Sequence, residues 1–102
     1  VAHFAAEDDR AALAVIRRLL SFVPQNNLED APRTEPRDSP DRADEELDSL
    51  LPDDPNKPYD MLSVIRSVSD RNHFYEIMPS YAKNMITGFS EVEGRVCGVV
   101  AN

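Results

Sequence analysis

The stretch "SEVEGRVCGVVAN" (residues 90–102) carries the clearest structural signal in the sequence. Glu93 and Gly94 separate two runs rich in β-branched residues, and a Gly at the second loop position tolerates the positive φ of a type I′ turn. The pattern predicts a β-hairpin with three facing pairs: Val92 with Arg95, Ser90 with Cys97, and Gly88 with Val99. The second run is apolar at consecutive positions, so both faces of that strand need cover.

Two more elements are predicted directly before the hairpin. The sequence "HFYEIMP" (residues 73–79) is typical of a short strand, which Pro79 closes. Before it, "YDMLSVIRSVSD" (residues 59–70) repeats apolar residues at helical spacing, and Asp60 is suited to cap the first turn. We therefore expect a helix over about residues 60–69. Its apolar face consists of Met61, Leu62, Ile65 and Val68.

An amphipathic helix is predicted over residues 8–23, near the other end of the chain. Pro24 ends the apolar pattern. Acidic side chains in the first turn stabilise the helix, because their negative charge interacts favourably with the free N–H groups there. Its apolar face consists of Leu13, Ile16, Leu20 and Val23, and Ala12 and Leu19 flank this face. Consecutive side chains point around a helix and do not converge, so we expect no metal site at Glu7, Asp8 and Asp9.

The acidity of the chain is concentrated in its middle. The formal net charge is −8, and residues 28–60 hold twelve acids and four bases, together with six of the eight prolines. A segment of this composition cannot bury enough apolar surface to fold alone. We therefore expect an irregular connector that lies extended on a surface outside this chain. It contains one helical turn, near residues 44–50, which Pro52 ends.

The composition excludes several classes of function. Nucleic-acid binding needs clustered Lys and Arg, which this acidic chain lacks, and no run approaches the roughly 20 apolar residues of a membrane-spanning helix. Cys97 is the only cysteine and is expected to be a small buried side chain without a disulfide. His73 and Asp70 are close enough in sequence to suggest an acid–base pair, but we expect a solvated histidine at this junction. No catalytic or metal-binding residue is predicted.

These elements together predict an α+β fold class: two helices, a short strand and a C-terminal hairpin, joined by the acidic, Pro-rich connector. Because the chain opens on Val1 and neither end has a polar fringe, with Val99 to Ala101 all apolar, we interpret it as an internal fragment of a larger protein. The isolated fragment is then expected not to fold cooperatively, since too few elements are present to cover the hairpin.

The order of the segments resembles one protein family. The strings "VAHFAAEDD", "LLSFVPQNN", "LLPDDPNKPYDMLSVIRSVSD" and "FYEIMPSYAKNMITGFSEVEGRVCGVVAN" follow one another as in the middle of the carboxyltransferase (beta) subunit of biotin-dependent acyl-CoA carboxylases. The wording "FYEIMPSYAKNMITGF" (residues 74–89) is most similar to propionyl-CoA carboxylase beta chains. The resemblance covers essentially the whole chain, and the acidic connector is its least specific part.

The resemblance implies a crotonase-like α/β fold in two domains. Residues 1–27 would then end the N-terminal carboxyltransferase domain, residues 28–58 would be the interdomain connector, and residues 59–102 would start the C-terminal domain. The implied reaction transfers a carboxyl group from carboxybiotin to an acyl-CoA, with propionyl-CoA favoured, while backbone N–H groups stabilise the enolate oxygen. Those donors lie in Gly-rich loops that no string here matches, so we carry over no catalytic residue, assign no cofactor-binding residue, and expect the fragment alone to be inactive.

The family also implies cofactors and partners. Biotin would be carried on a partner subunit or domain, and a coenzyme A thioester would be the substrate. The expected partners are the rest of the carboxyltransferase chain, further copies in a homo-oligomer, and the biotin carboxylase and biotin carrier subunit, with no nucleic acid and no membrane. The location would be cytoplasmic, or the mitochondrial matrix in a eukaryote. The alternative is a non-enzymatic interaction module whose acidic arm binds a protein partner.

Overall fold

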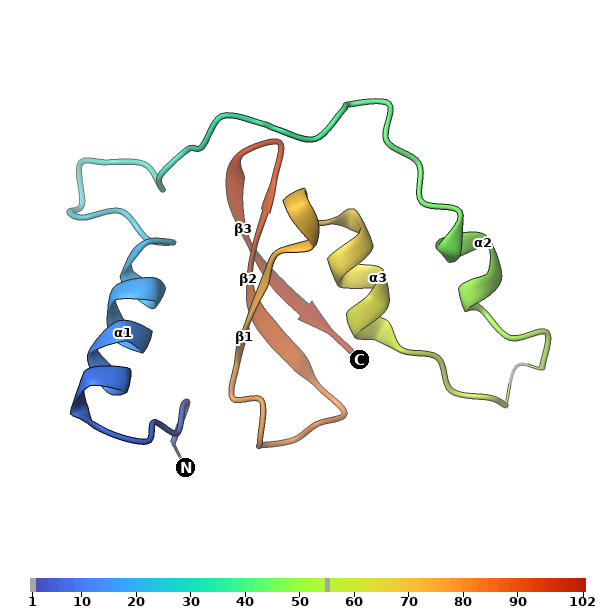
Figure 1. The fold of residues 1–102 in the computed structure, drawn as a ribbon, viewed down its shortest axis with the longest axis horizontal. Helices are drawn as coiled ribbons and strands as arrows, with labels where there is room; N and C mark the ends of the chain where they lie inside the picture. The colour runs from blue at the N-terminus through green and yellow to red at the C-terminus, as the bar shows by residue number, and fades with distance from the viewer. Residues whose placement is uncertain (1, 55) are drawn as a thin grey trace.

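The computed structural model describes residues 2–54 and 56–102. Val1, in the expected end of the first domain, and Pro55, in the expected connector, lie outside the described residues. The described part contains a three-stranded antiparallel sheet with a helix on either side, and the connector crosses one end of it (Figure 1). The elements in order are α1 (Asp9–Leu20), α2 (Glu46–Leu50), α3 (Met61–Val68), the 3₁₀ turn η1 (Asp70–Asn72), β1 (Phe74–Ile77), β2 (Ile86–Val92) and β3 (Arg95–Ala101).

The predicted hairpin is confirmed, including its register. Strands β2 and β3 pair through Val92 with Arg95, Ser90 with Cys97, and Gly88 with Val99. Glu93 has φ of 51° and Gly94 has φ of 68°, as the type I′ turn requires. The predicted short strand is also present as β1, and it pairs antiparallel with β2 to give the order β1-β2-β3.

One face of the sheet is covered by α3, whose start the sequence predicted correctly. The Asp60 carboxylate accepts a hydrogen bond of 3.0 Å from the Leu62 N–H, which caps the helix. At the far end of α3 the Ser90 hydroxyl of β2 donates to the Ser69 hydroxyl at 2.5 Å, and both residues are buried. Ile65 is 5% exposed, but Val68 is 54% exposed, so the predicted apolar face is wrong at its last position.

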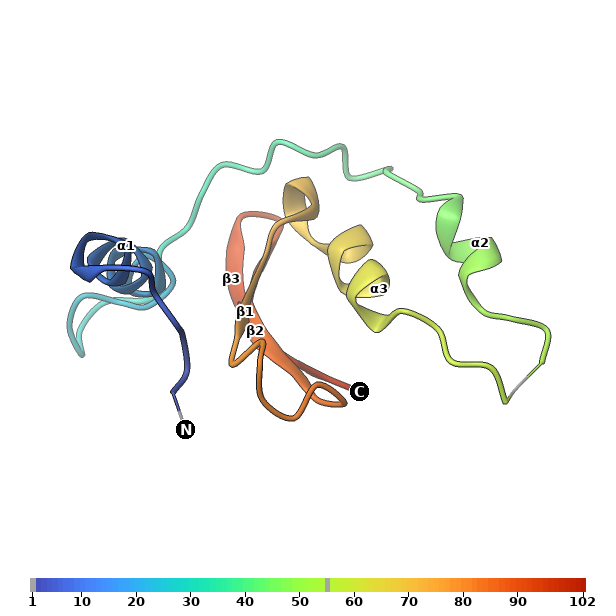
Figure 2. The ribbon, with the colours of Figure 1, turned by 60° about the horizontal axis from the view of Figure 1, so that its bottom comes forward.

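The opposite face of the sheet is covered by α1 and the residues that follow it, as both views show (Figures 1 and 2). The Phe22 ring, 5% exposed, stacks on Tyr75 of β1 and Phe89 of β2, with centroid distances of 5.4 and 5.5 Å. The Tyr75 hydroxyl donates to the Val15 carbonyl at 3.2 Å. The helix predicted for the N-terminal segment is therefore packed on the same sheet as α3.

The predicted apolar face of the N-terminal helix is only partly confirmed, because its flanking residues Ala12 and Leu19 and its last residue Val23 are half-buried but the other three are exposed. Leu13, Ile16 and Leu20 are 54%, 51% and 50% exposed. The half-buried positions lie on another side of the helix: Ala11, Ala12, Val15 and Leu19. The helix carries apolar residues on more than one side, and the bulky Phe22 that follows it selects the side that meets the sheet.

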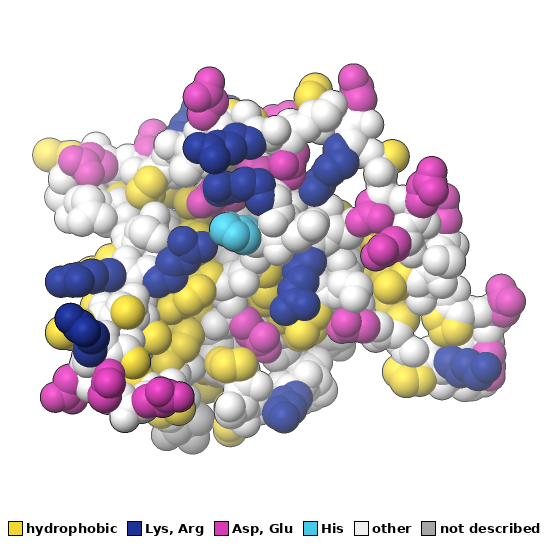
Figure 3. Space-filling view, in the orientation of Figure 1, with side chains coloured by type: hydrophobic (Ala, Val, Ile, Leu, Met, Phe, Trp, Pro, Cys, Tyr) yellow, Lys and Arg dark blue, Asp and Glu magenta, His cyan; other side chains and the backbone are white. Residues whose placement is uncertain are grey.

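The described residues of the connector are irregular apart from α2, as predicted, but the expected position of the connector is wrong. It does not lie only on a surface outside the chain, because Arg33 forms an isolated antiparallel bridge with Arg95 of β3. The Thr34 N–H donates to the Gly94 carbonyl at 2.9 Å. The Gly94 carbonyl lies in the tight turn, where it is free to accept a hydrogen bond, and the connector supplies the N–H donor. Acidic side chains gather around α2 at the right of the molecule (Figure 3).

Within the described residues, no helix has the length and apolar character that crossing a membrane would require.

Candidate functional site

A cleft of about 710 Å³ lies between the connector and the turn of the hairpin. We call residues 33–44 of the connector the strap, because this segment forms one wall of the cleft. The opposite wall comes from the end of α3, from η1 and from the hairpin turn. Apolar and charged side chains both line the cleft. The apolar ones include Pro36, Pro40, Val68 and Val92. The charged ones are Arg33, Asp38, Arg42, Asp70, Glu93 and Arg95.

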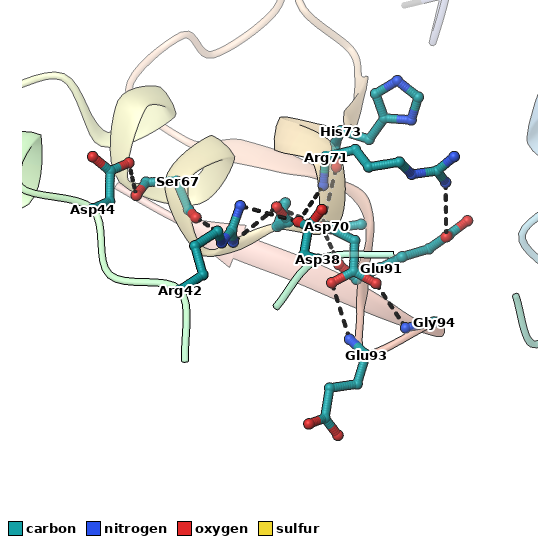
Figure 4. A network of polar contacts seen from close by, with 12 residues as sticks. Asp38, Arg42, Asp44, Ser67, Asp70, Arg71, His73, Glu91, Glu93 and Gly94 are labelled. Carbon is teal, nitrogen blue, oxygen red and sulfur yellow. Dashed lines mark hydrogen bonds and ion pairs between the residues drawn. The ribbon is translucent and has the colours of Figure 1, made fainter. Parts of the chain in front are cut away.

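The Asp70 carboxylate binds the turn of the hairpin. It accepts hydrogen bonds from the N–H groups of Glu93 at 3.0 Å and Gly94 at 2.7 Å. The His73 side chain is exposed and points away from Asp70, whose backbone carbonyl accepts from the His73 N–H at 2.9 Å (Figure 4). The solvated histidine is thus confirmed, and no acid–base pair forms because Asp70 is used to hold the turn.

A second carboxylate, that of Asp38, joins the strap to η1. It accepts a hydrogen bond of 2.7 Å from the Arg71 N–H and forms an ion pair of 3.1 Å with Arg42. The Arg42 guanidinium also donates to the carbonyls of Ser67 at 2.7 Å and Ser69 at 3.2 Å, at the C-terminal end of α3. Arg42 therefore serves as a C-terminal cap that comes from a distant segment (Figure 4).

Two further contacts extend this network. The Thr34 hydroxyl donates to the Glu91 carboxylate at 2.8 Å, and Arg71 approaches the same carboxylate at 3.5 Å. At the other end of the strap the Ser67 hydroxyl donates to the Asp44 carboxylate. This bond, together with the Glu46 N–H, lowers the pKa of Asp44 below its usual value.

The lone thiol is half-buried on β3, so the expected burial of Cys97 is only partly met. Its sulfur donates to the Ser90 carbonyl at 3.6 Å. Burial, and then the negative charge of Asp70, raise the pKa of the Cys97 thiol. Because a raised pKa keeps the thiol protonated, Cys97 is not an activated nucleophile.

The network holds backbone together and offers little for chemistry. Its carboxylates accept from N–H, hydroxyl and guanidinium groups, and the described residues contain no cluster of three or more His, Cys, Asp or Glu that could hold a metal ion. Asp8 accepts from the Ala11 N–H at 2.7 Å, so it caps α1. The strap network was not predictable from the sequence, because Asp38 and Arg71 are distant in the chain. Its one local signal is the opposite charge of Asp38 and Arg42, which are four residues apart.

Comparison with known proteins gives the chain a family. Residues 1–102 match the family described as the carboxyl transferase domain. The chain is 51% identical to methylmalonyl-CoA decarboxylase subunit alpha of Veillonella parvula and 52% identical to the propionyl-CoA carboxylase beta chain of Roseobacter denitrificans, in each case over 100% of this chain and 20% of the relative. It is 43% identical to the mitochondrial propionyl-CoA carboxylase beta chain of Mus musculus, covering 19% of that protein. The chain spans about a fifth of the length of these relatives.

Solved structures agree with this assignment. A transcarboxylase 12S structure with methylmalonyl-coenzyme A and methylmalonic acid bound superposes with a TM-score of 0.90 at 42% identity, over 98% of this chain and 19% of that one. The beta subunit of geranyl-CoA carboxylase from P. aeruginosa shares the fold, with a TM-score of 0.56 at 24% identity, over 95% of this chain and 18% of that one. The α+β arrangement is thus that of a segment of a carboxyltransferase, crotonase-like fold. The chain belongs to the carboxyl transferase domain family.

Proposed function

We propose that the chain is part of the carboxyltransferase component of a biotin-dependent acyl-CoA carboxylase. The observation that carries this proposal is the match to propionyl-CoA carboxylase chains at 47% and 52% identity, which extends over the whole of this chain and 20% of each relative. Methylmalonyl-CoA is propionyl-CoA with a carboxyl group on the α-carbon, so the decarboxylase and carboxylase relatives act on the same carbon–carbon bond. This shared chemistry favours propionyl-CoA as the acceptor of a carboxyl group from carboxybiotin.

Within such an enzyme this segment has a structural role. It positions the sheet between α1 and α3 and ties the connector to the hairpin. The described residues contain no activated nucleophile and no acid–base pair, so the enolate chemistry is assigned to residues of the enzyme outside this segment. Biotin is proposed to be carried on a partner subunit or domain, and the acyl-CoA to be the substrate.

The domain assignment is part of the same proposal. Residues 1–27 end one crotonase-like domain, residues 28–58 join the two, and residues 59–102 start the second. The stacking of Phe22 on Tyr75 and Phe89 supports a direct contact between the two domains within one chain. The protein would act as a homo-oligomer, as the hexamer of transcarboxylase 12S suggests, with a biotin carboxylase and a biotin carrier. It would be cytoplasmic, or mitochondrial in a eukaryote, as in mouse and pig relatives.

The alternative function, an interaction module with an acidic binding arm, has less support. Two carboxylates of that arm already bind groups of this chain. Asp38 binds Arg42 and the Arg71 N–H, and Asp44 binds the Ser67 hydroxyl. The charge of Asp38 is thus already paired within this chain.

The test is an acyl-CoA series with the full-length protein. Purified protein is given carboxybiotin and, in separate reactions, acetyl-CoA, propionyl-CoA or 3-methylcrotonyl-CoA, and the carboxylated thioester is measured by mass spectrometry. We expect carboxylation of propionyl-CoA at the highest rate. A protein that folds but carboxylates none of the three would contradict the proposal.

A further inference from the structure

We propose that the strap holds two left-handed turns, Arg71 with Asn72 and Glu93 with Gly94, as one cooperative unit. The strap is then a conformational clamp of the second proposed domain and not a passive linker. This inference concerns the connector alone and does not depend on the proposed activity.

The two turns need support from outside themselves. Arg71 and Asn72 have φ of 53° and 56°, and Glu93 has φ of 51° next to Gly94 at 68°. Three of these four residues have a Cβ atom, which makes the left-handed region unfavourable. Such conformations persist where neighbouring groups hold them.

The strap provides that support for both turns. Asp38 accepts from the Arg71 N–H, and Thr34 donates to the Gly94 carbonyl. The strap also lies directly against the hairpin turn, since a Cβ atom on Gly94 would come within 1.9 Å of the Thr34 carbonyl oxygen.

Contacts between the turns close the unit. The Asp70 carboxylate of η1 accepts from the N–H groups of both Glu93 and Gly94. Glu91, just before the hairpin turn, accepts from the Thr34 hydroxyl and pairs with Arg71. Each turn is thus tied to the strap and to the other turn, so loosening the strap at η1 is transmitted to the hairpin.

The position of the unit gives it a consequence for the sheet. η1 ends at Asn72, one residue short of the start of β1 at Phe74, and the hairpin turn joins β2 to β3. Arg42 caps the end of α3 from the same strap. The clamp therefore fixes the end of the sheet against α3.

Hydrogen exchange of the full-length protein, measured by mass spectrometry without substrate, tests the proposal. In Asp38→Ala, peptides covering residues 68–74 and 90–97 should both exchange about tenfold faster, as expected for the loss of a charged hydrogen bond. Asp38 makes no hydrogen bond or ion pair to residues 90–97, so the second peptide reports the coupling. Asp41→Ala, an exposed acid in the same strap, is the matched control and should leave both peptides unchanged.

Acceleration of residues 68–74 alone, or of neither peptide, would overturn the proposal. If Asp38→Ala does not fold, Arg42→Met replaces it, since this variant keeps the aliphatic stem and removes the guanidinium that binds Asp38, Ser67 and Ser69. This variant should accelerate hydrogen exchange in the same two peptides. Exchange of residues 90–97 at the wild-type rate would again contradict the clamp. This test does not measure carboxyltransferase activity. A negative result here would therefore contradict the clamp and leave the proposed function unaffected.

Discussion

Replacement of Gly94 by alanine should destabilise the protein through the contact between the strap and the hairpin. Gly94 has φ of 68°, and a Cβ atom there would lie 1.9 Å from the Thr34 carbonyl oxygen and 2.9 Å from its carbonyl carbon. Both atoms belong to backbone, so neither can move aside by a change of rotamer. The strap must therefore shift, or the turn must change its conformation.

Two contributions set the magnitude of the effect. A residue with a Cβ atom in the left-handed region costs about 1 to 2 kcal/mol. Displacement of the strap breaks the hydrogen bond of 2.9 Å between the Thr34 N–H and the Gly94 carbonyl, which contributes about 1 kcal/mol. Gly94→Ala should thus lower the free energy of unfolding by about 2 to 3 kcal/mol.

Urea unfolding of the full-length protein, followed by circular dichroism, measures this difference. Gly98→Ala on strand β3 is the matched control, because no atom of the described residues lies within 4 Å of a Cβ atom placed there. The control should change stability by no more than about 0.5 kcal/mol. If Gly94→Ala proves as stable as the control, the contact between the strap and the turn is not as described.

Three other variants test the packing and the electrostatics of the chain. Gly88→Ala should cost about 1 to 3 kcal/mol of unfolding free energy, because its Cβ atom would lie 2.4 Å from the Tyr75 carbonyl oxygen; thermal unfolding measures it. Phe22→Ala should cost about 3 to 5 kcal/mol in the same assay, whereas truncation of the exposed Leu13 should cost far less. Ser67→Ala removes the main cause of the lowered pKa of Asp44. A pKa lowered in the folded state stabilises the protein above the unfolded value of about 4, and this contribution disappears as the pH falls through the folded pKa, so the variant should lose less stability than wild type in an acid titration.

Elements with a local cause were predictable from the sequence. The hairpin follows from the Glu93 and Gly94 loop, whose backbone conformation fixes the register of both strands. The start of α3 follows from Asp60, whose carboxylate caps the helix within two residues. In both cases the decisive interaction joins residues that are close in the chain.

Features that depend on distant contacts were not predictable in the same way. The stripe of Leu13, Ile16 and Leu20 has helical spacing, but the side of α1 that meets the sheet is chosen by the stacking of Phe22. The N–H of the left-handed residue Arg71 donates to Asp38, which comes from another segment of the chain. An acidic, Pro-rich composition predicts the absence of regular structure correctly, yet it does not tell where the segment lies.

Transfer of a labelled carboxyl group is a direct test of the proposed carboxyltransferase activity toward propionyl-CoA. Full-length protein is incubated with radiolabelled carboxybiotin and propionyl-CoA, and the label is followed into acid-stable product. We expect the label to appear in methylmalonyl-CoA, at a rate that depends on both the protein and propionyl-CoA. Label that stays on biotin, or is lost as CO₂ at the same rate with and without propionyl-CoA, would contradict it.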